Sequence, residues 1–302
     1  MKFTKCLSVV SIAAALAGCA SVADPRGGTG PARGAPASVP VVTADPGPAV
    51  AGRVTVQWLG QSAFRITSAT GKVIVIDPYL TANPKTPPAY KNLAALGKVD
   101  LILVTHGHTD HFLDAPALSK MNSAPVWAPA GLSQSMQTLG ILPMPLANRM
   151  NKGGSITPFG PGGVRITMTR AEHSSELLWR NDATGKDETH VGGEPCGFLI
   201  ELENGLRIWH MGDTGVFGDM RLLGEMYRPD LLLVPIGGGP FVMNPADAAM
   251  ATRDLVKPRM AVPMHYGTNP QLAGTPAQFV DALGTSSPVR VLAIQPGEAL
   301  AF

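Results

Sequence analysis

The 302-residue chain has little charge: Asp, Glu, Lys and Arg make up 15% of it, and its formal net charge is +2. It contains no run of basic residues and no stretch in which aromatic and basic residues alternate. Proteins that bind nucleic acid need a basic patch to neutralise phosphates. We therefore expect no nucleic-acid partner. A small molecule or a lipid as substrate and association into a homo-oligomer stay open.

Cysteine is also scarce. Cys6 and Cys19 lie in the first twenty residues, which leaves Cys196 alone in the rest of the chain. A disulfide framework needs paired cysteines, so none is expected in the folded domain. We expect Cys196 to be a small buried apolar residue rather than a nucleophile.

The only long apolar stretch, Leu7 to Leu16, follows a short basic start and is too short for an ordinary membrane span. It leads into Leu16-Ala17-Gly18-Cys19, which resembles the lipobox of a bacterial lipoprotein signal. The resemblance implies a signal peptide over residues 1–18 and lipidation of Cys19. Because Ala20 rather than aspartate follows, it also implies a cell-envelope protein anchored in the outer membrane and facing the periplasm. A plain secretory signal with an incidental cysteine is the alternative.

Residues 19–52 are rich in Pro, Gly and Ala and have no apolar periodicity, so we expect a lipidated flexible tether there. The folded domain then covers residues 53–302. Within it, strands are followed by helix–strand alternation, and this order then recurs, which predicts an α/β fold with two sheets and helices outside. A hairpin is expected across Asn204-Gly205. Residues 177–190 are expected to form a mobile loop, whose apolar start at 177–179 either touches acyl chains or packs.

The run from Thr105 to His111 contains three of the seven histidines and one carboxylate, directly after the apolar residues 101–104. His106 and His108 are two positions apart, so they point to the same side of an extended backbone. Asp110 and His111 follow where the chain leaves the strand. Imidazoles with a carboxylate at a strand tip indicate a divalent-metal site, and the density of ligands favours two ions.

Three more residues of ligand type lie just beyond apolar strands, namely His173, Asp213 and His265. Histidine and carboxylate without cysteine suit zinc, manganese or iron. Each residue has a structural alternative: a solvated loop histidine, a turn aspartate and a core histidine, respectively. The recurrence of one pattern at four strand ends favours ligation.

The remaining candidates have lesser roles. His210 is expected to be structural or to lie next to the ligands, and His190 is given no role. Asp77 ends a strand and is predicted to orient the histidine-rich loop.

These segments resemble the ligand motifs of the metallo-β-lactamase superfamily over roughly residues 53–302. Longer stretches, such as those at 212–220 and 263–268, resemble the metal-dependent hydrolase family near the ascorbate-phosphate lactonases. The resemblance implies a four-layer αββα sandwich with two divalent ions, expected to be zinc, with manganese or iron as alternatives. It implies one ion held by His106, His108 and His173, and another held by Asp110, His111 and His265, with Asp213 bridging the two.

The implied enzyme uses a hydroxide bridged by two metal ions to cleave a phosphodiester or a lactone or ester bond. Asp110 is predicted to orient the water and move a proton, and Tyr266 either donates a hydrogen bond to the oxyanion or packs in the core. His108 stands where flavin-linked di-iron oxidoreductases have glutamate, which argues against their chemistry. Asp213 stands where β-lactamases proper have cysteine or no bridging acid, which argues against antibiotic hydrolysis.

Two alternatives remain. A lipid anchor would suit a membrane-tethered phosphodiesterase resembling the N-acylphosphatidylethanolamine phospholipase D relatives. The other alternative is a non-catalytic periplasmic metal-binding protein of the envelope, against which the full ligand set weighs.

Overall fold

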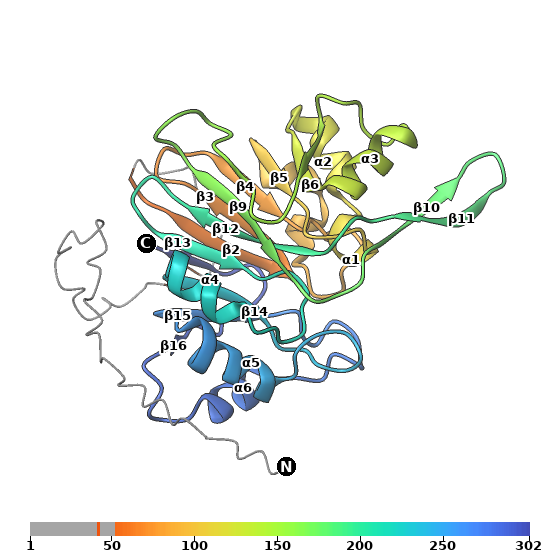
Figure 1. The fold of residues 1–302 in the computed structure, drawn as a ribbon. Helices are drawn as coiled ribbons and strands as arrows, with labels where there is room; N and C mark the ends of the chain where they lie inside the picture. The colour runs from red at the N-terminus through yellow and green to blue at the C-terminus, as the bar shows by residue number, and fades with distance from the viewer. Residues whose placement is uncertain (1–40, 43–51) are drawn as a thin grey trace, which may run out of the picture. The chain divides into compact units, whose positions relative to one another are not determined.

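The computed structural model describes residues 41–42 and 52–302, and these form two sheets, a separate hairpin and the surrounding helices (Figure 1). The first sheet has eight strands, which lie side by side in the order β1 (Val41–Val42), β17 (Ala299–Ala301), β2 (Thr55–Gly60), β3 (Ala63–Thr67), β4 (Val73–Ile76), β5 (Leu101–Leu103), β6 (Val126–Pro129) and β7 (Ala147–Met150). Strands β4 to β7 are parallel, and the others pair antiparallel.

The second sheet has seven strands, in the order β16 (Arg290–Val291), β15 (Met260–Met264), β14 (Leu231–Pro235), β13 (Arg207–His210), β12 (Cys196–Glu201), β9 (Arg165–Arg170) and β8 (Ser155–Ile156). Strands β13 to β16 are parallel. The expected hairpin across Asn204-Gly205 is confirmed, since β12 and β13 pair antiparallel around it.

Alternate side chains of the central strands pack into different hydrophobic cores, which separates the layers. In β5, Leu101 and Leu103 face a core that both sheets share, whereas Ile102 faces a second core on the outer side of the first sheet. In β14, Leu231 and Leu233 face the shared core and Leu232 faces a third core. Successive strand residues point to opposite faces, so each of these strands is buried on both sides.

Helices cover the two outer faces. The second core joins the first sheet to α2 (Ala115–Asn122) and α3 (Ala130–Thr138), and the third joins the other sheet to α4 (Met220–Tyr227), α5 (Pro245–Met250) and α6 (Pro276–Leu283). Shorter elements are α1 (Thr109–Phe112), the 3₁₀ helices η1 (Pro88–Lys91) and η2 (Leu93–Leu96), and the π-helix η3 (Ala251–Val256). The predicted four-layer αββα sandwich is therefore confirmed.

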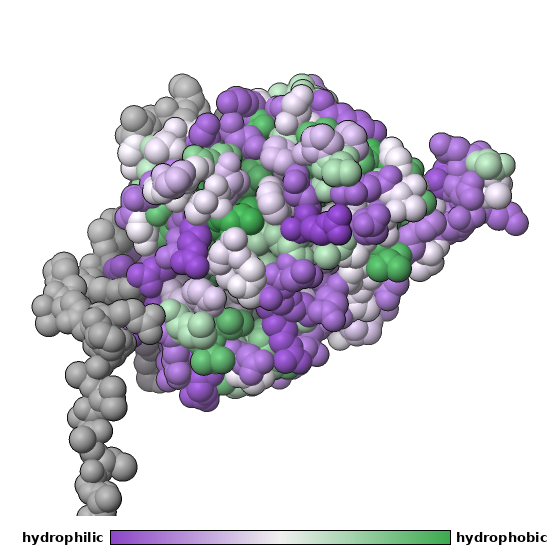
Figure 2. Space-filling view, turned by 45° about the horizontal axis from the view of Figure 1, so that its top comes forward, coloured by the Kyte–Doolittle hydropathy of each residue, from purple (hydrophilic) through white to green (hydrophobic). Residues whose placement is uncertain are grey.

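The prediction of a loop over 177–190 was wrong. Strands β10 (Glu176–Asn181) and β11 (Lys186–Val191) form an antiparallel hairpin that projects from the sheets (Figure 1) and is mostly hydrophilic at its end (Figure 2). The tip has no buried face, so the sequence shows no apolar alternation there. The apolar residues 177–179 do not form a single exposed surface, because Leu177 is buried, Leu178 is 52% exposed, and Trp179 packs against the second core.

The predictions of a signal peptide, lipidated Cys19 and most of the tether lie outside the described residues. Within the tether range, Val41–Val42 forms β1 and pairs with β17. Among the helices of the described part of the chain, none has both the length and the apolar character to cross a membrane.

Candidate metal centre

The predicted ligands come together at one edge of the two sheets. His106 follows β5, His173 follows β9, Asp213 follows β13, and His265 directly follows β15. Within each sheet these strands run in the same direction, so their carboxyl ends lie at one edge. The loops that follow the strands bring their side chains together at that edge. Asp110 and His111 lie in the short helix α1 that begins after His108.

The first group consists of His106, His108 and His173, whose ligand atoms lie within 4.8 Å of one another. His106 Nε2 lies 3.0 Å from His108 Nδ1. The ring of His173 stands 5.1 Å from that of His106 and 5.2 Å from that of His108, nearly perpendicular to both. Three imidazoles from two loops thus converge on one point.

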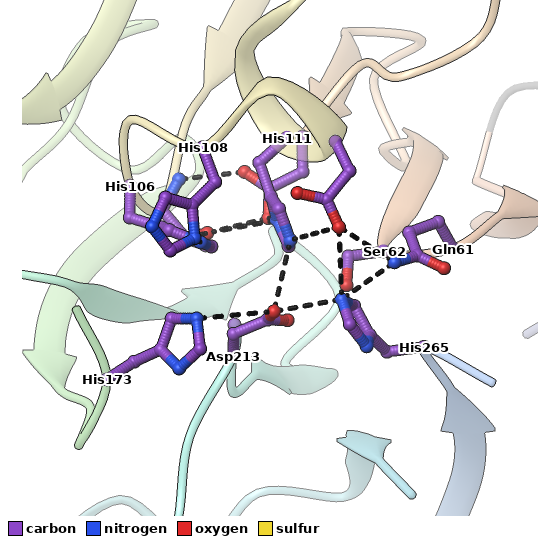
Figure 3. Close-up of polar contacts among 12 residues, drawn as sticks. Gln61, Ser62, His106, His108, His111, His173, Asp213 and His265 are labelled. Carbon is purple, nitrogen blue, oxygen red and sulfur yellow. Dashed lines mark hydrogen bonds and ion pairs between the residues drawn. The ribbon is translucent and has the colours of Figure 1, made fainter. Parts of the chain in front are cut away.

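The second group consists of Asp110, His111, Asp213 and His265, again within 4.8 Å. Asp213 lies at its centre (Figure 3), with Oδ2 at 2.8 Å from His265 Nε2 and 3.3 Å from His111 Nε2. The same oxygen lies 3.7 Å from His173 Nε2 in the first group. Asp213 therefore occupies the position between the groups that a shared carboxylate requires.

The donor set fits divalent cations. Buried polar atoms are nearly always hydrogen-bonded, yet Asp213 Oδ1 and His111 Nε2 are buried without a hydrogen-bond partner among the described residues. Histidine and carboxylate donors without a thiolate suit zinc, manganese or iron. Each group has enough donors to hold one ion.

The electrostatics of the second group reflect the density of its charges. Burial alone would raise the pKa of Asp213, yet His111 and His265 hold that pKa well below its ordinary value. Burial alone would lower the pKa of His111, but Asp213, Asp110 and Asp77 raise it well above. Burial opposes a rise in the pKa of His265 too, but Asp213 and Asp110 raise it to about 9. The carboxylates of this group therefore stabilise positive charge beside them.

The first group differs. Burial lowers the pKa of His106 and of His173. Both imidazoles are therefore held neutral, which is the form that donates a lone pair to a metal.

A buried carboxylate orients the histidine-rich loop, as predicted for Asp77. Asp77 Oδ1 accepts from the Thr105 amide at 2.7 Å, and Oδ2 accepts from Thr105 Oγ1 at 2.7 Å. Oδ2 also lies 2.8 Å from His111 Nδ1. That contact leaves His111 Nε2 to face the second group, the usual arrangement of a metal-bound histidine backed by a carboxylate.

Two further residues, not predicted from the sequence, contact the ligand candidates. Glu176, at the base of β10, places Oε2 3.0 Å from His108 Nε2. Gln61 lies in the turn between β2 and β3 and points its side chain at Asp110 and His265. Neither residue carries a sequence signal, because both reach the site through pairing of distant segments.

Other candidates separate into structural roles. His210 is fully buried, contacts the Ser62 carbonyl oxygen through Nε2 at 2.9 Å and accepts from the Gly212 amide, contacts that suit a structural role. His190 lies on β11, 4.0 Å from Glu188. Cys196 is free and buried, as expected.

Tyr266 packs its ring against Trp58, with centroids 5.3 Å apart, and burial raises its pKa to about 12. Tyr266 is not among the residues that line the cavity over the two groups. The geometry therefore favours packing, and the oxyanion role stays a prediction.

A cavity of about 510 Å³ opens over both groups. Its floor includes ligand candidates from each group, and its walls contain Tyr79, Pro84, Phe241 and Leu272 together with the neutral polar residues Gln61, Thr268 and Asn269. Neither lysine nor arginine is among the lining residues. A substrate can therefore reach both groups from one side.

Comparison with known proteins agrees with this geometry. Residues 72–266 match the family described as the β-lactamase superfamily domain. The chain is 60% identical over 256 residues to a UPF0173 metal-dependent hydrolase of Cupriavidus necator, covering 85% of this chain and 88% of that protein. It is 54% identical over 295 residues to a UPF0173 metal-dependent hydrolase of Cupriavidus taiwanensis, covering 98% of this chain and 99% of that protein.

Solved structures show the same fold. Igni18, described as a novel metallo hydrolase from Ignicoccus hospitalis, matches with a TM-score of 0.69 and 30% identity, covering 83% of this chain and 98% of that one. An isothiocyanate hydrolase from Delia radicum gut bacteria matches in fold with a TM-score of 0.59 and 21% identity, covering 82% and 98%. The chain thus belongs to the metallo-β-lactamase superfamily and, within it, to the UPF0173 metal-dependent hydrolases.

Proposed function

We propose that this metal-dependent hydrolase binds two divalent ions, expected to be zinc, and cleaves a phosphodiester or a lactone or ester bond. The observation that carries the proposal is the pair of ligand groups under one cavity, joined by Asp213. Two ions held there would supply the Lewis acidity that makes water a nucleophile near neutral pH and stabilises an oxyanion.

The chain's own residues prepare the site for this reaction. Asp110 lines the cavity and places Oδ2 3.4 Å from His265 Nε2 and 3.6 Å from His111 Nε2. Burial would raise its pKa, but His111 and His265 hold the pKa well below the ordinary value, so Asp110 is ionised. An ionised carboxylate at the cavity wall can orient water and accept a proton from it.

Of the two bond classes, the cavity walls favour a neutral lactone or carboxylic ester. Its apolar walls suit an acyl or aliphatic group, and no lysine or arginine among the lining residues would add to the charge of the two ions in binding a phosphodiester anion. Zinc-loaded protein should therefore show a higher kcat/KM on lactones and p-nitrophenyl esters than on bis(p-nitrophenyl) phosphate. The reverse order would assign the site to phosphodiesters.

His108→Ala tests whether the metal groups carry the activity. The variant should lose the first ion and at least about 100-fold of the activity, because a metal ligand is removed. His190→Ala is the matched control, since it removes a histidine outside both groups. Elemental analysis should find close to two equivalents of ion in the wild type and the control. Less than one equivalent, with no activity on any ester, would support the non-catalytic metal-binding protein instead.

We propose further that the protein is anchored by lipid at Cys19 in the outer membrane and faces the periplasm. The lipobox-like segment before Cys19 supports this proposal. Labelling cells with a radioactive or alkyne fatty acid should mark the wild type and leave Cys19→Ser unmarked. Equal labelling of both would remove the anchor from the proposal.

An anchor would bring the site close to phospholipids, which motivates the phospholipase D-like alternative. Zinc-loaded protein incubated with outer-membrane lipid extract would then release head groups or phosphatidic acid. The absence of any such product would exclude this alternative while leaving the ester proposal intact.

A further inference from the structure

Gln61 is fixed in place by its backbone. It is buried, lies between β2 and β3, and has a φ of +52°, which is unfavourable for a residue with a side chain. Its carbonyl oxygen accepts from Trp58 Nε1 at 2.9 Å and from the His265 amide at 3.1 Å. Strained conformations persist where the surroundings determine them, and they concentrate at functional sites.

The Gln61 side chain lies between two elements of the second metal group. Its Nε2 donates to Asp110 Oδ2 at 2.8 Å and lies 2.8 Å from His265 Nε2 (Figure 3), while Oε1 accepts from Thr268 Oγ1. A carboxylate can only accept, so the amide nitrogen has to face Asp110. The threonine hydroxyl then fixes the orientation of the amide from its other end.

Asp110 is the member of the second group that most needs such support. Its side chain is 36% exposed, whereas those of His111, Asp213 and His265 are nearly fully buried. It also lies in α1, a helix of only four residues. A hydrogen bond from a buried, neutral amide restricts this carboxylate without adding charge to the site.

We propose that Gln61 is a positioning residue: its amide, oriented by Thr268, fixes the Asp110 carboxylate for binding of the second metal ion and for proton transfer. The proposal rests on the proposed function, to which both the second ion and the proton transfer belong. Binding of the second ion can be measured without any substrate.

The test uses the full-length protein and zinc alone as the probe. Gln61→Met keeps the length and burial of the side chain but removes the amide. Gln57→Met is the matched control, because Gln57 is a buried glutamine of β2, the strand before Gln61, and its amide donates to Tyr90 Oη and the Gly297 carbonyl oxygen, away from the metal groups. Both variants lose buried hydrogen bonds, so both should lower the melting temperature.

Only Gln61→Met should weaken the second zinc, by about 10-fold or more in competition with a chelator, as found when partners of metal ligands are removed. Thr268→Val should give a smaller loss in the same direction. With an ester substrate, Gln61→Met should lower kcat more than it changes KM.

Unchanged binding of the second zinc in Gln61→Met would overturn the proposal. An equal loss in Gln57→Met would also overturn it, because that result would show a general effect of stability. If the wild type hydrolyses no ester, the proposed function fails, while the zinc measurement still decides the role of Gln61.

Discussion

Two carboxylate–histidine pairs support the metal groups, and they differ in how deeply they are buried. Asp77 and His111 are both fully buried, and the carboxylate also receives two hydrogen bonds from Thr105. Glu176 and His108 have a similar contact distance, but their side chains are 55% and 28% exposed. The first pair is part of the sheet core, and the second depends on the hairpin β10–β11.

The comparison indicates that a carboxylate–histidine contact of similar length is stronger when it is buried than when it is exposed. Water screens an exposed ion pair and competes for its hydrogen bonds, whereas a buried pair keeps its full interaction and leaves unsatisfied groups when one partner is removed. We therefore expect the second metal group to be rigid and the first to be adjustable. Four measurements test this contrast.

Asp77→Ala should have the largest effect. It would leave the Thr105 amide, the Thr105 hydroxyl and His111 Nδ1 buried without their acceptor, at a cost of about 3 kcal/mol in the free energy of unfolding. Zinc affinity of the second group should fall by about 100-fold. Urea unfolding and chelator competition measure the two effects.

Asp100→Ala is the control for Asp77→Ala, because Asp100 accepts from the Val73 amide at the other end of β4. It should reduce stability and leave zinc binding unchanged. Equal zinc loss in both variants would contradict a specific role for Asp77.

Gly192→Ala should come next. A Cβ at this position would stand 2.4 Å from the Ser175 carbonyl oxygen, so the base of the hairpin would have to move and carry Glu176 with it. The first zinc should bind about 10-fold more weakly, with little change at the second. Gly218→Ala, where a Cβ meets nothing within 4 Å, is the control.

Glu176→Gln should have a smaller effect, about 3-fold on the first zinc, because solvent already screens the pair. In this variant an amide oxygen replaces the carboxylate oxygen opposite His108 Nε2, and His108 itself is kept. Glu188→Gln on the same hairpin should bind zinc as the wild type does. A loss as large as that of Asp77→Ala would show that exposure does not weaken this pair.

The contrast also explains what could be predicted from the sequence. The role of Asp77 is predictable because Asp77 ends an apolar strand, so a local pattern is enough. The role of Glu176 is not predictable, because the sequence that follows it, residues 177–190, predicts a loop and not a hairpin. Alternation is visible only where a strand has a buried face, and beyond Leu177 this hairpin has almost none.

The same limit applied to Gln61. A glutamine in a strand turn carries no signal for metal binding, and its role depends on the contact of that turn with the loop after β15, more than two hundred residues later. The ligands were predictable because each follows an apolar strand, and strand ends meet at one edge. Their supporting contacts were not, because they depend on which loops pack together.

Ionic strength should give the smallest effect and the most direct view of the contrast. Between about 0.05 M and about 0.5 M NaCl the Debye length falls from about 14 Å to about 4 Å, which weakens exposed charge pairs more than buried ones. The ratio of first-zinc affinities between wild type and Glu176→Gln should therefore shrink towards one at high salt. The corresponding second-zinc ratio for Asp77→Ala should stay constant, since no solvent reaches that pair. If both ratios shrank together, burial would not be what separates the two pairs.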